Sequence, residues 1–304
     1  MFSQYFGHYL LNHGLISHTD LSQALAFQKS VHVKFGVIAV DQGFMTSAQV
    51  DEVHEKQKQM DKRFGEIALE LGYLTDEQIQ SLISHQKQSH LYLAQALVDL
   101  NIMTMDQFSK ALSDYKQEYS LSDNQFEALR NGNIDTLIEN ILMKKDATLQ
   151  ETYSKYLSLF AKNMIRFIDD QVYLELEENK TVDQGNWIVH QEIVGGAPLF
   201  TALNLQEDAL LHIASIYAEE ELSEVDELAK DAVSEFLNLH NGIYLVNMSN
   251  WGTELTMKPQ KITKHATISG ELLPVTVKTS KGSFQLLLSS TPSTVNLQEN
   301  YTLI

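Results

Sequence analysis

A 24-residue unit that recurs every 29 residues restricts the fold of this chain more than any other feature. The copies are residues 5–28, 34–57, 63–86 and 92–115, with five residues between each copy and the next. Their third positions are Gly7, Gly36, Gly65 and Ala94. A fixed period of this length is typical of arrays in which each repeat is one small structural unit that buries its apolar face against its neighbours.

Each copy has the signals of two short helices joined by a tight turn. The tenth position is a residue type that readily takes the left-handed conformation at the end of a helix: Gly14, Gly43, Gly72 and Asn101. Three residues later comes a helix N-cap in every copy: Ser17, Thr46, Thr75 and Thr104. In three copies the cap is threonine and glutamine follows three residues on, which predicts a capping box.

The second helix of each copy has apolar residues at helical spacing. Examples are Leu21, Ala24 and Leu25 in the first copy, and Ile79, Leu82 and Ile83 in the third. One copy cannot bury such a face alone. We therefore expect the copies to stack into a compact all-α domain over residues 1–118, with the fourth copy, which lacks both glycines, capping one end.

The pattern Phe-Gly-x-x-Leu, Gly-(Leu/Phe/Tyr)-(Ile/Met/Leu)-(Ser/Thr) and Leu-x-x-Ala-Leu-x-x-Gln, which the first copy carries in full, resembles the MshEN or GspE N-terminal domain. In that family two consecutive 24-residue motifs, five residues apart, bind cyclic di-GMP. The family motif usually opens with Arg-Leu-Gly, and only the third copy keeps the arginine, as Arg63. The resemblance thus implies a cyclic di-GMP site in copies two and three, with these contacts: Lys34, Gly36, Gln57, Arg63, Gly65 and Gln86. In the alternative interpretation the glycines pack helices and the basic side chains are solvated, in an array that has lost its ligand.

Composition excludes several classes of function. The chain has no cysteine, which excludes disulfides, thiolate metal sites and a cysteine nucleophile. No apolar run approaches the roughly 20 residues that span a bilayer, so we expect a cytoplasmic protein without membrane insertion. The net charge of −18 is unfavourable for binding DNA or RNA. His8, His13 and His18 are five residues apart and would fan around a helix, so we expect no metal site.

The remaining sequence predicts a helical connector and an α+β domain. Residues 119–147 form the connector, with helices at 123–130 and 134–144. Within the domain, residues 148–304, helices are predicted at 149–169, 207–219 and 225–240, the last ending before Asn241-Gly242. Strands are predicted at 172–177, 187–194, 199–203, 243–248, 254–257, 272–279 and 283–289. Grouping of strands and helices favours a mostly antiparallel sheet with helices on one face.

The helix predicted at 225–240 carries Asp231-x-x-x-Glu235-x-x-Asn238, whose spacing places three polar side chains along one stripe. This pattern is similar to the (Asp/Ser)-x-x-x-Glu-x-x-Asn signature of the CheC, CheX and FliY phosphatases. Gly242, four residues after Asn238, and a strand ending near Pro259 also agree with that family. The resemblance covers roughly residues 149–289 and implies a CheX-like α+β domain. Asn163 lacks a glutamate three residues before it, so a single motif per chain is expected, as in CheX.

The activity implied by this resemblance is hydrolysis of the aspartyl phosphate of a CheY-like receiver domain. The receiver would bring its own Mg²⁺, and the chain would need no cofactor of its own. Asn238 would orient the attacking water, Glu235 would pair with a lysine of the receiver, and Asp231 would add a docking contact. The leading hypothesis is therefore a receiver phosphatase whose activity is biased by cyclic di-GMP in the repeats.

Three alternatives stay open. The polar stripe can be the solvated face of an amphipathic helix. The chain can be a non-enzymatic adaptor, which binds a receiver or a secretion or pilus component without hydrolysis. It can also be a cyclic di-GMP effector whose C-terminal domain serves to form a homodimer through a sheet edge.

Overall fold

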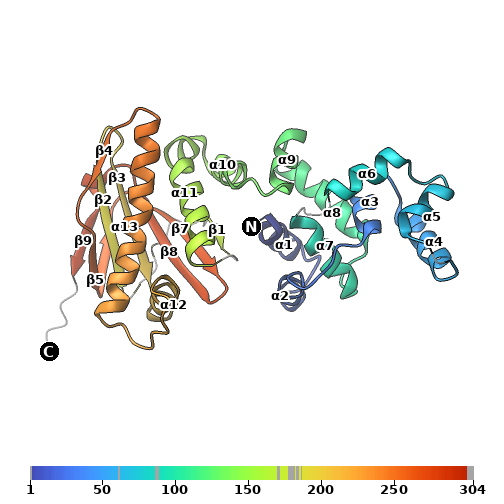
Figure 1. Ribbon diagram of the computed structural model, residues 1–304. Helices are drawn as coiled ribbons and strands as arrows, with labels where there is room; N and C mark the ends of the chain where they lie inside the picture. The colour runs from blue at the N-terminus through green and yellow to red at the C-terminus, as the bar shows by residue number, and fades with distance from the viewer. Residues whose placement is uncertain are drawn as a thin grey trace. The chain divides into compact units, whose positions relative to one another are not determined.

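The computed structural model describes residues 2–60, 62–85, 89–169, 172–176, 182, 185 and 187–299 (Figure 1). The chain divides into two compact units, Met1–Leu137 and Ile138–Ile304. The first unit therefore contains the repeats together with α9 (Asp123–Arg130), the first helix of the predicted connector. The second connector helix, α10 (Ile134–Lys145), crosses the division between the units. In the described part of the chain no helix is long and apolar enough to cross a membrane.

The repeats form two helices each, as predicted. The helices are α1 (Phe2–Asn12), α2 (His18–Phe27), α3 (Phe35–Asp41), α4 (Ser47–Gln57), α5 (Phe64–Glu70), α6 (Asp76–His85), α7 (Ser89–Asp99) and α8 (Met105–Glu118). The tenth position of every copy has positive φ, from 55° at Asn101 to 71° at Gly72. The N-cap side chains accept the expected backbone N–H groups, as at Thr46, which accepts from Gln49 at 3.3 Å. The turn and capping signals in the sequence are thus confirmed.

The glycine at the third position allows the two helices of a repeat to approach each other closely. A Cβ atom at Gly7 would lie 2.5 Å from Leu21 Cδ1, and one at Gly36 would lie 2.5 Å from Val50 Cγ1. Carbon atoms in contact are separated by about 3.5–4.0 Å, so neither position has room for a methyl group as it stands. At Gly65 the nearest atoms would be 3.7 Å away, which is ordinary contact.

The fourth repeat does not cap one end of the array, so that expectation is wrong. Its helix α7 packs against α1, α2 and α3, and α8 packs against α1 and α3 (Figure 1). Leu91, Leu93, Ala94 and Leu97 of α7 are all fully buried. Apolar residues around most of its circumference make α7 a central helix of the unit.

The second helix of the third repeat is more exposed than predicted. Ile83 in α6 was predicted to be buried, but 54% of its surface is exposed. Helix α6 packs against α3, and Leu82 of α6 is fully buried. The repeat pattern alone predicts the same burial for every copy, whereas burial depends on which neighbours a copy has.

A buried ion cluster joins three helices of the first unit. The side chains of Asp41, His90 and Arg130 are 3%, 0% and 9% exposed. His90 Nε2 lies 3.0 Å from Asp41 Oδ1, and the Arg130 guanidinium pairs with the other carboxylate oxygen. Burial raises the pKa of Asp41, but the hydrogen bond from His90 and the charges of His90 and Arg130 outweigh burial and hold this pKa below its usual value. The cluster explains why α9 belongs with the repeats.

The second unit is an α+β domain with an antiparallel sheet, as predicted. Its elements are α11 (Ala147–Phe167), β1 (Tyr173–Glu175), β2 (Trp187–Gly195), β3 (Leu199–Leu205), α12 (Glu207–Tyr217), α13 (Glu227–Asn250), β4 (Leu255–Met257), β5 (Lys261–Lys264), β6 (Ala266–Ser269), β7 (Leu273–Thr279), β8 (Gly282–Ser289), the 3₁₀ turn η1 (Pro292–Thr294) and β9 (Asn296–Glu299). The sheet order is β1-β7-β8-β3-β2-β4, with β5 also paired to β2 and β6 paired to β9. Helix α13 packs against β2, β4, α11 and α12 (Figure 1). Strands β5, β6 and β9 were not predicted, and residue 177 of the predicted first strand lies outside the described residues.

The helix that carries the polar stripe is longer than predicted. It continues through Asn241-Gly242 to Asn250, so the predicted stop and the predicted strand at 243–248 are both wrong. Asn241 is fully buried and its side chain is hydrogen-bonded inside the domain. Tyr244 and Met248 continue the buried face beyond it. Tertiary packing therefore overrides a pair of residues that often ends a helix.

Candidate functional site

Helix α13 brings Glu235 and Asn238 together at the surface of the second unit. The helix begins at the N-cap Asp226, whose side chain accepts the Ala229 N–H at 2.9 Å. Glu235 is exposed and Asn238 is half-buried. Glu235 Oε2 accepts from Asn238 Nδ2 at 3.3 Å, and its Oε1 accepts from Gln260 Nε2 at 2.9 Å. Two of the three predicted residues thus form one hydrogen-bonded site.

Asp231, the third predicted residue, is exposed one turn before Glu235 on the same face. Its spacing from Glu235 places two carboxylates side by side along the helix. Such a surface favours a cationic group on a partner. Asp231 therefore fits a docking contact, at a distance from the hydrogen bonds around Asn238.

Sequence reasoning missed Gln191, which lies directly beneath the site. This residue of β2 is 1% exposed. Its Nε2 donates to Asn238 Oδ1 at 3.0 Å and to the Lys258 carbonyl at 2.9 Å. A signal was present: Trp187, Val189, Gln191 and Ile193 occupy the buried register of β2, and a glutamine among apolar residues there requires polar partners.

Charged and titratable groups surround the pair. Lys258 Nζ forms an ion pair with Glu192 Oε2 at 2.7 Å. Burial, and then the charge of Glu235, raise the pKa of Tyr217. Beside Glu235 the Tyr217 hydroxyl therefore stays protonated at neutral pH. The site combines the Asn238 amide, the exposed Glu235 carboxylate and a protonated tyrosine hydroxyl with the ion pair of Lys258 and Glu192.

Asn163 on α11, where CheC-type proteins would have a second motif, does not lie in a second surface site. It is buried, and its Nδ2 is 3.0 Å from His240 Nδ1. Burial also lowers the pKa of His240 to about 3, so this ring is neutral in the folded protein at pH 7. The interaction is a structural contact between α11 and α13.

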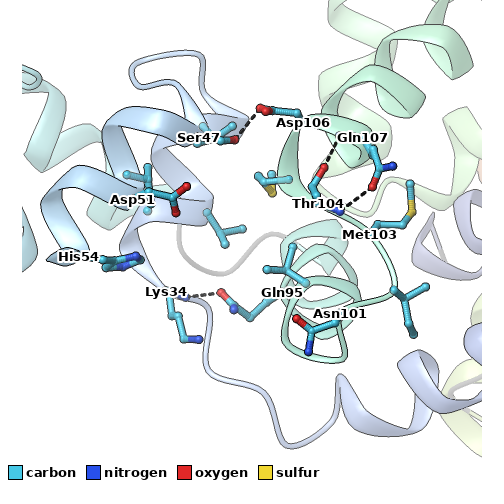
Figure 2. A pocket seen from close by; sticks show the side chains of 17 residues that line it. Lys34, Ser47, Asp51, His54, Gln95, Asn101, Met103, Thr104, Asp106 and Gln107 are labelled. Carbon is cyan, nitrogen blue, oxygen red and sulfur yellow. Dashed lines mark hydrogen bonds between the residues drawn. The ribbon is translucent and has the colours of Figure 1, made fainter.

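The first unit has a cavity of about 570 Å³ between the second and fourth repeats. Of the residues predicted to bind cyclic di-GMP, Lys34 and Gly36 line it. The other polar residues that line it are Ser47, Asp51, His54, Gln95, Asn101, Thr104, Asp106 and Gln107 (Figure 2). Valine, isoleucine and methionine side chains make up the rest of its lining. The cavity thus pairs copies two and four, and not the consecutive copies two and three.

The other predicted ligand residues have different surroundings. Gln57 Nε2 donates to the Lys62 carbonyl at 3.2 Å. Arg63 is the N-cap of α5, and its backbone N–H donates to Glu66 Oε2 at 2.9 Å. Gly65 packs near Ile79 in the same repeat. Gln86 lies outside the described residues.

Lys34 is engaged in two interactions at the edge of the cavity. Its Nζ pairs with Asp99 Oδ1 at 2.7 Å. Its backbone N–H donates to Gln95 Oε1 at 2.9 Å, as Figure 2 shows. Gln95 Nε2 in turn donates to Asp99 Oδ1 at 2.9 Å.

Among the described residues, no group of three or more His, Asp or Glu side chains is placed to hold a metal ion.

Comparison with known proteins gives partial likenesses. No family model matches the chain, and no curated protein matches it. Solved structures similar to about half of it include the chemotaxis protein CheX from Desulfovibrio desulfuricans, with 16% identity, coverage of 46% of this chain and 98% of the other, and a TM-score of 0.36. A CheC-like superfamily protein from Shewanella sp. PV-4 has 17% identity, coverage of 45% and 96%, and a TM-score of 0.38. The CheX–CheY–BeF₃–Mg²⁺ complex from Borrelia burgdorferi has 12% identity, coverage of 49% and 98%, and a TM-score of 0.40.

Proposed function

We propose that the second unit hydrolyses the aspartyl phosphate of a receiver domain, with Glu235 and Asn238 as its catalytic pair. The observation that carries the proposal is the fixed amide of Asn238 beside the exposed carboxylate of Glu235, joined by a 3.3 Å hydrogen bond. The solvated face of an amphipathic helix does not require a buried partner such as Gln191 for one of its side chains. The residue pattern shared with the CheC, CheX and FliY phosphatases supplies the reaction class.

The reaction requires this chain only to position the attacking water and the receiver. The receiver supplies the acyl phosphate and its Mg²⁺, and the oxygen of a water molecule attacks phosphorus as the bond to the aspartyl oxygen breaks. The products are inorganic phosphate and a free aspartate. The Asn238 amide would hold the water in line, and positioning of this kind removes much of the barrier. The Glu235 carboxylate would pair with a receiver lysine and hold the two proteins in register.

The test is phosphate release from receivers charged with acetyl phosphate. Wild type is compared with a Glu235→Ala, Asn238→Ala double variant and with a matched control, Glu227→Ala, Asn250→Ala, which changes exposed residues at the two ends of the same helix. We expect wild type and control to accelerate release, and the site variant to lose this activity. If wild type binds receivers from its own organism but accelerates none of them, the proposal is wrong and the adaptor alternative is correct.

We also propose that the first unit binds cyclic di-GMP and thereby biases the phosphatase. The resemblance of the repeats suggests the ligand. The cavity beside Lys34 and Gly36 has a volume of about 570 Å³, which lies in the usual range for ligand pockets. To reach a phosphate, the Lys34 ammonium would exchange its ion pair with Asp99 for one with the ligand.

Calorimetric titration of the whole chain with cyclic di-GMP tests this second proposal. Loss of binding in Arg63→Ala places the ligand on the consecutive copies two and three. Loss in Lys34→Ala with retention in Arg63→Ala places it in the cavity. Absence of binding at ligand concentrations up to about 100 µM, where even a weak complex would form, rules out the proposal that the first unit binds cyclic di-GMP.

A further inference from the structure

We propose that Gln191, Asn241 and Tyr156 form a relay that sets the orientation of the Asn238 side-chain amide, so that its N–H group faces Glu235 and the substrate. These three are positioning residues, since none of them would touch the receiver phosphate. The functional part of this inference rests on the proposed phosphatase activity.

The relay is a continuous series of hydrogen bonds from the core to the surface. The Tyr156 hydroxyl donates to Asn241 Oδ1 at 2.7 Å, and Asn241 Nδ2 donates to Gln191 Oε1 at 2.8 Å. Gln191 Nε2 donates to Asn238 Oδ1 at 3.0 Å, and Asn238 Nδ2 donates to Glu235 Oε2 at 3.3 Å. Every bond runs in the same direction, from donor inside to acceptor outside.

Groups that can only accept fix the direction of this series. The hydrogen-bond partners of a side-chain amide decide which of its two ends is the N–H₂ group and which is the oxygen. Gln191 Nε2 also donates to the Lys258 carbonyl at 2.9 Å, and a carbonyl cannot donate. The amide nitrogen of Gln191 must therefore face Asn238, and Asn238 must turn its oxygen inward.

The orientation of Asn241 is fixed in the same way. The Thr201 hydroxyl gives its hydrogen to the Gln191 backbone carbonyl at 3.1 Å, so its oxygen is left to accept from Asn241 Nδ2 at 3.0 Å. Asn241 Oδ1 then faces Tyr156. Burial raises the pKa of Tyr156, which keeps the hydroxyl protonated as a donor.

Reversal of Asn238 would break both of its contacts. Its Nδ2 would face the Gln191 N–H group, donor against donor, and its Oδ1 would face the Glu235 carboxylate, acceptor against acceptor. Gln191, Thr201, Asn241 and Tyr156 are all fully buried or nearly so, so water cannot replace the partner lost on the inner side of Asn238. A single amide orientation is thus imposed on the surface residue from beneath.

This orientation specifies how Asn238 would act. Its N–H₂ group is the outward end, with Glu235 as a neighbouring acceptor. An attacking water would accept from this N–H group, while its own hydrogens face carboxylate or phosphoryl oxygens. Without Gln191 the amide would rotate freely, and the reactive arrangement would be populated for only part of the time.

The test compares kcat and KM of the whole chain on a phosphorylated receiver for Gln191→Leu, Gln191→Glu and the control Gln285→Leu. Gln191→Glu has nearly the native size but loses the N–H₂ donor. Gln285 is also a buried glutamine of the same sheet, and it bonds to Asn204 at 3.3 Å and not to Asn238. We expect kcat to fall about 10- to 100-fold in both Gln191 variants. KM should stay within about twofold, because Glu235 still docks the receiver.

A measurement that does not depend on activity accompanies the kinetics. The side-chain N–H₂ resonances of Asn238, identified by their loss in Asn238→Ala, should report a rigid group in wild type and a mobile one in Gln191→Leu. Unchanged mobility overturns the relay whether or not the protein is a phosphatase. Undiminished kcat in folded Gln191 variants of an active enzyme overturns its catalytic role. An inactive wild type with the expected change in mobility overturns the proposed function and the catalytic role while the relay stands.

Discussion

Replacing Gly36 and Gly65 by alanine, one at a time, separates helix packing from ligand binding as the reason for the repeat glycines. The two residues occupy the same position in adjacent repeats, but their surroundings differ. A Cβ atom at Gly36 would lie 2.5 Å from Val50 Cγ1, whereas at Gly65 the nearest atom, of Ile79, would be 3.7 Å away. The packing explanation therefore predicts opposite signs for the two changes.

The expected magnitudes follow from two opposing contributions. Alanine in place of a helical glycine favours folding by up to about 1 kcal/mol. At Gly36 the methyl group must displace Val50, whose branched side chain is stiff, and overpacking of this kind costs about 1–3 kcal/mol. We expect Gly36→Ala to lower the free energy of unfolding of the first unit by about 1–2 kcal/mol, and Gly65→Ala to raise it by up to about 1 kcal/mol.

Denaturant titration followed by two signals provides the assay. Both tryptophans, Trp187 and Trp251, lie in the second unit, so their fluorescence reports on that unit alone. Far-UV circular dichroism also reports on the helices of the first unit. Gly36→Ala should shift the dichroism transition to lower denaturant and leave the fluorescence transition in place. Equal stabilisation by both alanines, combined with loss of cyclic di-GMP binding, would refute the packing argument and support a ligand role for the glycines.

Three further changes have defined outcomes. Gly43→Ala should destabilise the first unit by about 1–2 kcal/mol in the dichroism assay, because φ is 68° there while a Cβ atom would meet nothing within 4 Å; an unchanged midpoint contradicts the strain argument. Asp41→Asn should cost about 3–5 kcal/mol in the same assay, since it leaves the Arg130 guanidinium, whose side chain is 9% exposed, without its buried carboxylate; a near-native transition would show that the pair adds little. Burial lowers the pKa of His240 from 6.5 to about 3, so below pH 6.5 the unfolded chain takes up a proton that the folded chain does not. Protonation of the unfolded chain therefore lowers the free energy of unfolding progressively as the pH falls from 6.5 toward 3. In His240→Phe the acid-induced loss of stability, measured by tryptophan fluorescence from pH 7 to 4, should be smaller than in wild type, and an identical pH dependence would count against this assignment.

Features that depend on neighbouring residues could be predicted from the sequence. The left-handed turns at Gly14, Gly43, Gly72 and Asn101 and the capping boxes follow from interactions within about one helical turn. The polar stripe that joins Glu235 to Asn238 follows from helical geometry in the same way. The antiparallel α+β class of the second unit could be predicted too, because alternation along a strand is a local pattern.

Other features depend on residues that are far apart in the chain, and the sequence pattern did not predict these features. Asn241 finds its partners Gln191 and Tyr156 at separations of 50 and 85 residues, and these bonds carry α13 past a local stop signal. Arg130 meets Asp41 across 89 residues, which draws α9 into the first unit. The central place of α7 and the exposure of Ile83 likewise depend on which repeats become neighbours. A repeat pattern and a helix period specify which face of an element is apolar. Burial and hydrogen bonding depend instead on what packs against that face. Gln191 therefore becomes part of the site only when β2 lies beneath α13.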